Sequence, residues 1–151
     1  MKLFKHIVCP YDNSDFSKKA LDYGSRLAVN DGDKLTILYV MVNPFIFEGG
    51  NPILSNNVLA TDLLDKMRGD EQLQLNNMMN QIKQTYPGVD VEVTLIENND
   101  VGDAIMQFQK RTSADLIVMG SHGRKGIKRF LLGSVAEAVL RNIDCPVLIV
   151  K

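Results

Sequence analysis

Residues 116–135 read LIVMGSHGRKGIKRFLLGSV. A short apolar run over 116–119 leads directly into a glycine-rich loop, and a segment of helical apolar period follows from Val135. A buried strand that feeds a loop and then a helix is typical of a βαβ unit in a parallel sheet. The stretch therefore predicts an α/β fold that carries a glycine-rich loop at the carboxyl end of a strand.

The rest of the chain repeats this alternation and predicts a single domain over residues 1–151 with five strands and four helices. The predicted strands cover 5–9, 35–42, 89–95, 116–119 and 147–150. Proline cannot donate to a β ladder, so Pro10 is expected to end the first strand. Ser14 is placed to cap the first helix, and Pro87-Gly88 is placed to end the second. Alternating valines and polar residues over 89–95 predict a strand at the sheet edge.

The composition restricts the partners and the compartment. The 151 residues are 45% hydrophobic and 23% charged, with a net charge of −1, which gives no reason to expect nucleic acid or an anionic membrane as partner. The longest apolar runs are too short to span a bilayer and the N-terminus lacks a signal-peptide pattern, so a cytoplasmic protein is expected. Cys9 and Cys145 lie in or beside apolar segments without zinc-ligand spacing, which predicts buried reduced thiols.

Residues 44–59 form a long predicted loop in which glycine, asparagine and proline are mixed with apolar side chains. A loop of this length inside a compact domain is uncommon. Two interpretations stay open: a mobile insertion, or a segment that covers a ligand or a partner surface.

The glycine-rich loop carries the chemistry. Glycine lets backbone N–H groups approach phosphate oxygens closely, and the N-terminus of a helix presents unpaired donors, here predicted at Gly133 and Ser134. Ligands of open α/β sheets collect outside the carboxyl ends of the strands, where this loop begins. The pattern predicts a phosphate site, although glycines at such turns also serve simply as turn formers.

Asp12 follows the first predicted strand, and its carboxylate is a candidate acceptor for ribose hydroxyls or, alternatively, a cap for the first helix. His122 has no acid or nucleophile in register with it, so no catalytic residue is assigned. The Walker pattern and the GxGxxG motif are both absent. These observations favour a nucleotide-binding protein over a fast hydrolase.

The spacing of Gly120, Gly123, Gly133 and Ser134, together with the start HIVCPYDNSDFS and the end DCPVLIVK, resembles the universal stress protein family, specifically its ATP-binding branch. The resemblance implies an adenine-nucleotide α-hydrolase-like fold, an open five-stranded parallel sheet of order 3-2-1-4-5 with helices on both faces. It also implies a homodimer formed through the last strand. The chain departs from the family pattern at Asn99 and Val101, where relatives often carry glycine and proline.

The same resemblance implies a ligand set. Pro10 and Asp12 would border the adenosine, the backbone of Val40 would contact the adenine, and Gly120 would lie near the ribose. The phosphates would be surrounded by His122, Gly123, Arg124, Gly133, Ser134 and Val135. The cofactor would be ATP, with ADP or AMP as alternatives, and Mg²⁺ would bridge phosphate oxygens without protein ligands to the metal.

Three functions are compatible with these features. The first is a regulatory ATP-binding module in a stress response, whose nucleotide biases the loops and hence partner contacts, with slow hydrolysis as a secondary activity. The second is a dimeric interaction protein of the same fold that binds no nucleotide. The third is an enzyme such as a nucleotidyl transferase or a phosphohydrolase, but the HxGH motif and the Ser-Gly-Gly pyrophosphate loop expected of those enzymes are absent.

Overall fold

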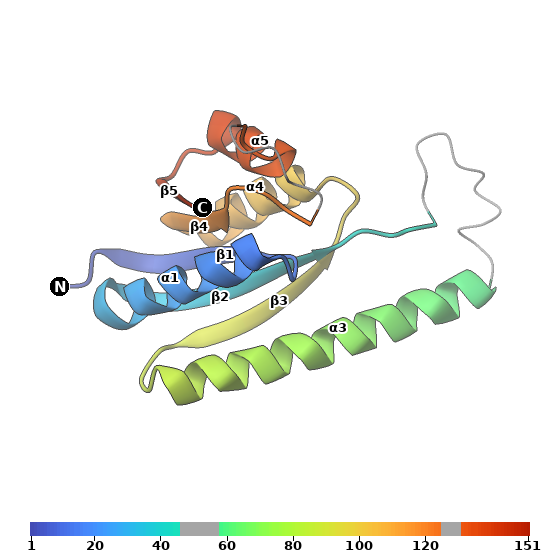
Figure 1. Ribbon diagram of the computed structural model, residues 1–151, viewed down its shortest axis with the longest axis horizontal. Coiled ribbons are helices and arrows are strands. Elements are labelled where there is room, and N and C mark those ends of the chain that lie inside the picture. The colour runs from blue at the N-terminus through green and yellow to red at the C-terminus, as the bar shows by residue number, and fades with distance from the viewer. Residues whose placement is uncertain (46–57, 125–130) are drawn as a thin grey trace.

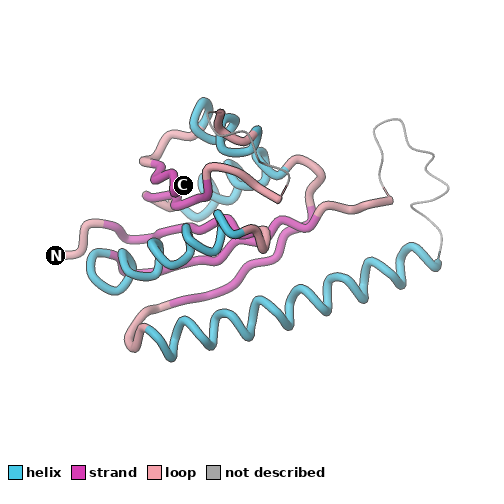
Figure 2. Tube along the Cα trace, in the orientation of Figure 1, coloured by secondary structure: helices cyan, strands magenta, loops and turns pink. Residues whose placement is uncertain are grey.

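The computed structural model describes residues 1–45, 58–124 and 131–151, and its elements alternate between strands and helices along the chain (Figures 1 and 2). They are β1 (Phe4–Tyr11), α1 (Asp15–Asp31), β2 (Gly32–Met41), α3 (Val58–Thr85), β3 (Val91–Glu97), α4 (Val101–Thr112), β4 (Leu116–Gly120), α5 (Ser134–Asn142) and β5 (Val147–Val150). The five strands form one parallel sheet in the order β3-β2-β1-β4-β5. The predicted order and the predicted edge position of β3 are confirmed.

Helices cover both faces of the sheet, with α1 and α3 on one side and α4 and α5 on the other (Figure 1). Successive residues of a strand point to opposite faces. Ile7 and Cys9 of β1 therefore pack in the core beneath α1 and α3, whereas Val8 packs beneath α4 and α5. Because both faces are buried, the inner strands have nearly continuous apolar runs.

The first helix begins and the second ends as the sequence predicts. Ser14 Oγ accepts a hydrogen bond of 3.1 Å from the amide of Ser17, which is an N-cap contact. After α3, Gly88 has a φ of 91°, a left-handed conformation that glycine adopts without strain. The predicted loop over 44–59 falls mostly on residues 46–57, which lie outside the described residues.

The prediction that Pro10 ends the first strand is wrong. β1 continues to Tyr11, and Pro10 is in register with Leu38 of β2. On its other side β1 pairs with β4 only through Ile7 and Val8. At Pro10, therefore, no residue of β4 pairs with β1. Proline is tolerated there because no hydrogen bond to β4 needs the N–H group that it lacks.

Both cysteines are free thiols, as predicted, but only Cys9 is fully buried and Cys145 is half-buried. Burial raises the pKa of both thiols above the usual range. No helix in the described part of the chain is both long enough and apolar enough to cross a membrane.

His6, on β1 near the amino end of the sheet, predicts a pH dependence of stability. The side chain is 8% exposed, and its Nε2 lies 2.7 Å from Thr36 Oγ1, which donates to Glu92 Oε1 at 3.0 Å. Burial, reinforced by the nearby Lys34 ammonium, lowers the pKa of His6 below 6.5. As the pH falls below 6.5, His6 becomes protonated in the unfolded chain but stays neutral in the folded protein. The folded state therefore loses stability until the pH passes the lower folded-state pKa of His6.

Urea unfolding at about pH 7.5 and about pH 5.5 checks this expectation. The His6→Gln variant should lose less stability between the two pH values than the wild type does. An equal loss in both proteins would contradict the assignment of the pH dependence to His6.

Candidate functional site

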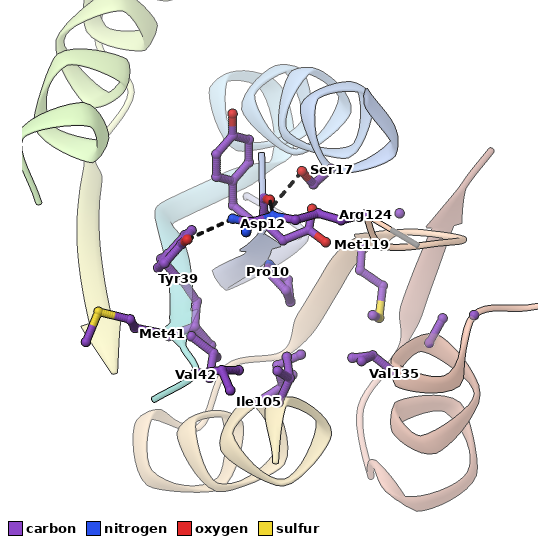
Figure 3. Close-up of a pocket in the computed structure, with 18 of the residues that line it drawn as sticks. Pro10, Asp12, Ser17, Tyr39, Met41, Val42, Ile105, Met119, Arg124 and Val135 are labelled. Carbon is purple, nitrogen blue, oxygen red and sulfur yellow. Dashed lines mark hydrogen bonds between the residues drawn. The ribbon is translucent and has the colours of Figure 1, made fainter. Parts of the chain in front are cut away.

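A cavity of about 490 Å³ opens at the carboxyl ends of β1, β2 and β4 (Figure 3). In the order β3-β2-β1-β4-β5 the winding direction reverses between β1 and β4, which is where open α/β sheets form their ligand crevice. The structure brings all ten predicted site residues to the wall of this one cavity. They are Pro10, Asp12, Val40, Gly120, His122, Gly123, Arg124, Gly133, Ser134 and Val135.

One side of the cavity is apolar. Its walls come from β2, β4 and the first turns of α4 and α5, and include Leu38, Val40, Ile105, Met119 and Val135. These side chains belong to the α4/α5 face of the sheet or pack against it. A flat aromatic group can be buried here without leaving a polar atom unpaired, as in most small-molecule sites.

The cavity wall also presents backbone donors from the start of α5. Gly133 is the N-cap and offers no side chain to cap the helix, and the first helical bond runs from the amide of Glu137 to the carbonyl of Gly133 at 2.9 Å. Among the described residues, nothing accepts from the amides of Ser134, Val135 or Ala136. Three N–H groups at the positive end of a helix dipole therefore face the cavity without a partner.

Gly120, Gly123 and Gly133 each let another part of the chain approach the backbone closely. A Cβ on Gly120 would lie 2.7 Å from Phe16 Cβ, and one on Gly123 would lie 2.9 Å from Asp12 Oδ2. A Cβ on Gly133 would lie 3.1 Å from His122 Cα, and the Gly133 amide already donates to the carbonyl of Ser121 at 2.8 Å. Gly133 thus shapes the loop and does not offer its own amide to a ligand.

Asp12 stabilises the turn into α1 with one carboxylate oxygen and leaves the other beside the cavity. Its Oδ1 accepts a hydrogen bond of 3.0 Å from the amide of Ser14, which fixes the turn into α1. Its Oδ2 faces Gly123 across the crevice, beside the cavity. One carboxylate oxygen therefore holds the turn, and the other stays available to accept from a ligand hydroxyl.

His122 has one ring nitrogen engaged and the other free. Its Nδ1 lies 3.0 Å from Ser121 Oγ, whereas Nε2 is buried and has no hydrogen-bond partner among the described residues. The ring packs against Phe16 with centroids 5.2 Å apart, which holds its orientation. When the Ser121 hydroxyl donates to Nδ1, Nε2 carries the proton and is an unpaired donor in a residue that lines the cavity.

Several lining residues were not predicted from the sequence, among them Tyr11, Tyr39, Met67 and Glu71. They lie on the α1/α3 side of the cavity, where α3 passes the ends of β1 and β2. Burial raises the pKa of Tyr11 and of Tyr39, so both hydroxyls stay protonated. Tyr39 could have been proposed from the sequence, because it directly precedes Val40 near the carboxyl end of β2. No sequence pattern around Glu71 indicates that it lies at the cavity.

The model of the universal stress protein family matches residues 3–151. The chain belongs to the universal stress protein family. Universal stress protein MJ0531 of Methanocaldococcus jannaschii is 38% identical over 150 residues, covering 99% of this chain and 83% of that protein. Two solved structures are similar as well. Protein MJ0577 of the same organism has a TM-score of 0.80 at 26% identity, covering 99% of this chain and 96% of that one. A universal stress protein in complex with cAMP has a TM-score of 0.62 at 26% identity, covering 99% and 98%.

In this universal stress protein, Gly120 at the end of β4 and Gly123 and Gly133 in the loop before α5 lie on the cavity wall. Within residues 1–45, 58–124 and 131–151, no group of three or more His, Cys, Asp or Glu side chains could hold a metal ion.

Proposed function

We propose that this universal stress protein binds ATP in the cavity at the β1/β4 crevice and acts as a regulatory nucleotide-binding module. The observation that carries the proposal is the pairing of an apolar compartment with the uncapped N-terminus of α5. The first suits a nucleobase, and the second suits phosphate. A relative solved with cAMP shows that a member of the family binds an adenine nucleotide.

The residues present fit the proposed cofactor. Buried His122 Nε2 lacks a partner, and Arg124 is the one permanently positive side chain among the described residues that line the cavity. Both would bind phosphate oxygens together with the amides of Ser134 and Val135. Mg²⁺ would be held by the phosphates, and its charge would offset theirs.

The adenosine would occupy the other half of the cavity. Asp12 Oδ2 would accept from a ribose hydroxyl, and the backbone of Val40 would bind the edge of the adenine. Pro10 would border the base, and Gly120 would lie near the ribose. The Ser121 hydroxyl that pairs with the His122 ring is buried and does not line the cavity, so we assign no catalytic residue and treat any hydrolysis as slow.

We further propose that the protein is a cytoplasmic homodimer paired through β5. This strand lies at the sheet edge and its Leu148 is 37% exposed, so its outer ladder groups have no strand to pair with among the described residues. The bound nucleotide would modulate partner contacts by biasing the loops around the cavity.

Isothermal titration calorimetry with Mg²⁺ and ATP, ADP or AMP tests nucleotide binding. One nucleotide should bind per chain, and ATP should bind most tightly because it places the most negative charge at α5. GTP should bind more weakly. The absence of binding at millimolar ATP would favour the alternative, a dimeric interaction protein that uses no nucleotide.

Asp12→Asn is expected to weaken ATP binding by about tenfold, the loss typical of one hydrogen bond to a charged group. Asparagine keeps the Oδ1 that accepts from Ser14, so the turn into α1 and the unfolding temperature should be preserved. Titration with 2′,3′-dideoxy-ATP supplies the control. That ligand has no hydroxyl for Asp12 to bind, so wild type and variant should bind it equally. A tenfold loss with this ligand too would contradict the ribose contact.

A further inference from the structure

The Arg124 side chain runs from the loop after β4 back toward the sheet. Its side chain crosses the ends of β1 and β2, where Nε donates to the carbonyl of Asp12 and Nη2 donates to Tyr39 Oη at 2.8 Å (Figure 3). The residue is exposed, yet both of its hydrogen bonds reach parts of the chain distant in sequence. The guanidinium therefore lies over the mouth of the cavity and is held there from two strands.

The two partners of Arg124 are neutral. A carbonyl and a protonated phenol are weaker acceptors for guanidinium than a phosphate, which binds it with two charge-assisted hydrogen bonds. Tyr39 is kept protonated, because burial raises its pKa. Any polyphosphate that reaches the N-terminus of α5 would compete successfully for this guanidinium.

A second charged group, Glu71, lies near the Tyr39 hydroxyl. Glu71 lines the same cavity from α3, and its Oε2 is buried without a hydrogen-bond partner among the described residues. The Glu71 carboxylate is close enough to raise the pKa of Tyr39, while Arg124 lowers it. The Tyr39 hydroxyl is therefore close both to a cation that donates to it and to a carboxylate.

From this arrangement we propose that Tyr39 is a positioning residue that holds Arg124 across the mouth of the cavity, and that nucleotide phosphates draw Arg124 away from it. The inference rests on the proposed nucleotide binding and adds a step to it. With Arg124 drawn away, the Glu71 carboxylate of α3 remains the charged group beside the Tyr39 hydroxyl. A nucleoside, which lacks phosphates, leaves the Arg124–Tyr39 bond in place.

Tyr39→Phe tests the exchange by calorimetry. The variant has no Arg124–Tyr39 bond to break, so it should bind ATP about threefold to tenfold more tightly than wild type, the range expected for one hydrogen bond of 0.7 to 1.4 kcal/mol. Adenosine affinity should not change. Tyr23→Phe, which alters an exposed tyrosine of α1, is the matched control and should change neither affinity. Unchanged or weaker ATP binding by Tyr39→Phe, or an equal shift for adenosine, would overturn the proposal.

A readout without ligand separates this proposal from nucleotide binding itself. The Arg124 Nη–H resonances, assigned through their loss in Arg124→Lys, should exchange slowly with water in free wild type and faster in Tyr39→Phe, because Nη2 donates to Tyr39 Oη. Fast exchange in free wild type would overturn the positioning role whether or not ATP binds. Slow exchange in a protein that binds no ATP would instead overturn the proposed function, and with it the exchange step.

Discussion

Gly123→Val is expected to weaken ATP binding on the order of a hundredfold, equivalent to the loss of two or three hydrogen bonds, without unfolding the protein. A Cβ at Gly123 would lie 2.9 Å from Asp12 Oδ2 and would push the carboxylate from the position proposed for ribose binding. The remaining branches of valine would occupy the space that phosphate oxygens need beside the loop. Calorimetric titration with ATP measures the loss.

Two features keep this variant interpretable. Gly123 is exposed and its φ is not in the left-handed region, so valine does not strain the backbone there. Gly69→Val on α3 is the matched control, because a Cβ at Gly69 meets nothing within 4 Å. Gly69→Val should bind ATP as wild type does. ATP binding by Gly123→Val at wild-type affinity would show that the nucleotide does not approach this loop.

Gly120→Ala is expected to destabilise the fold by about 3 kcal/mol, the upper part of the range for overpacking a core. The added Cβ would lie 2.7 Å from Phe16 Cβ and 2.9 Å from the backbone carbon of Phe16. The second contact is with backbone, so a change of side-chain rotamer cannot relieve it. The end of β4 and the first turn of α1 would have to move apart.

Urea unfolding of wild type, Gly120→Ala and Gly69→Ala measures this effect. In the exposed interior of α3, the Gly69→Ala change should raise the stability by up to about 1 kcal/mol. The two alanine substitutions should therefore have opposite signs. A loss below about 0.5 kcal/mol in Gly120→Ala would show that β4 and α1 can separate there without strain.

Local sequence patterns predicted most of the fold. The period of the apolar residues located the strands because both faces of the sheet are buried, and Ser14 and Gly88 marked helix ends through their own backbone chemistry. The error at Pro10 has a tertiary cause. Whether proline ends a strand depends on which neighbours pair with that side of it, and β4 stops pairing with β1 at Val8.

The candidate site was predictable where it is built from loops at strand ends. The glycine spacing and the family resemblance led to ten residues that the structure brings to one cavity. The residue that packs against each glycine was not predictable. The spacing of the glycines indicates that something approaches the backbone closely, but it does not identify the contacting residue. Glu71 and Met67 were missed because they reach the cavity through the placement of α3 against β2 and β3, which no local pattern encodes.

The central claim is that the unpartnered amides at the start of α5 receive the phosphates. Amide chemical shifts of the ¹⁵N-labelled protein, recorded as Mg²⁺ and ATP are added, test it directly. The amides of Ser134, Val135 and Ala136 should shift strongly downfield as they gain acceptors. Those at the start of α4, where the Asp100 side chain already caps the Asp103 amide at 2.9 Å, should move little. Saturation with ATP that leaves the three α5 amides unmoved would contradict the account.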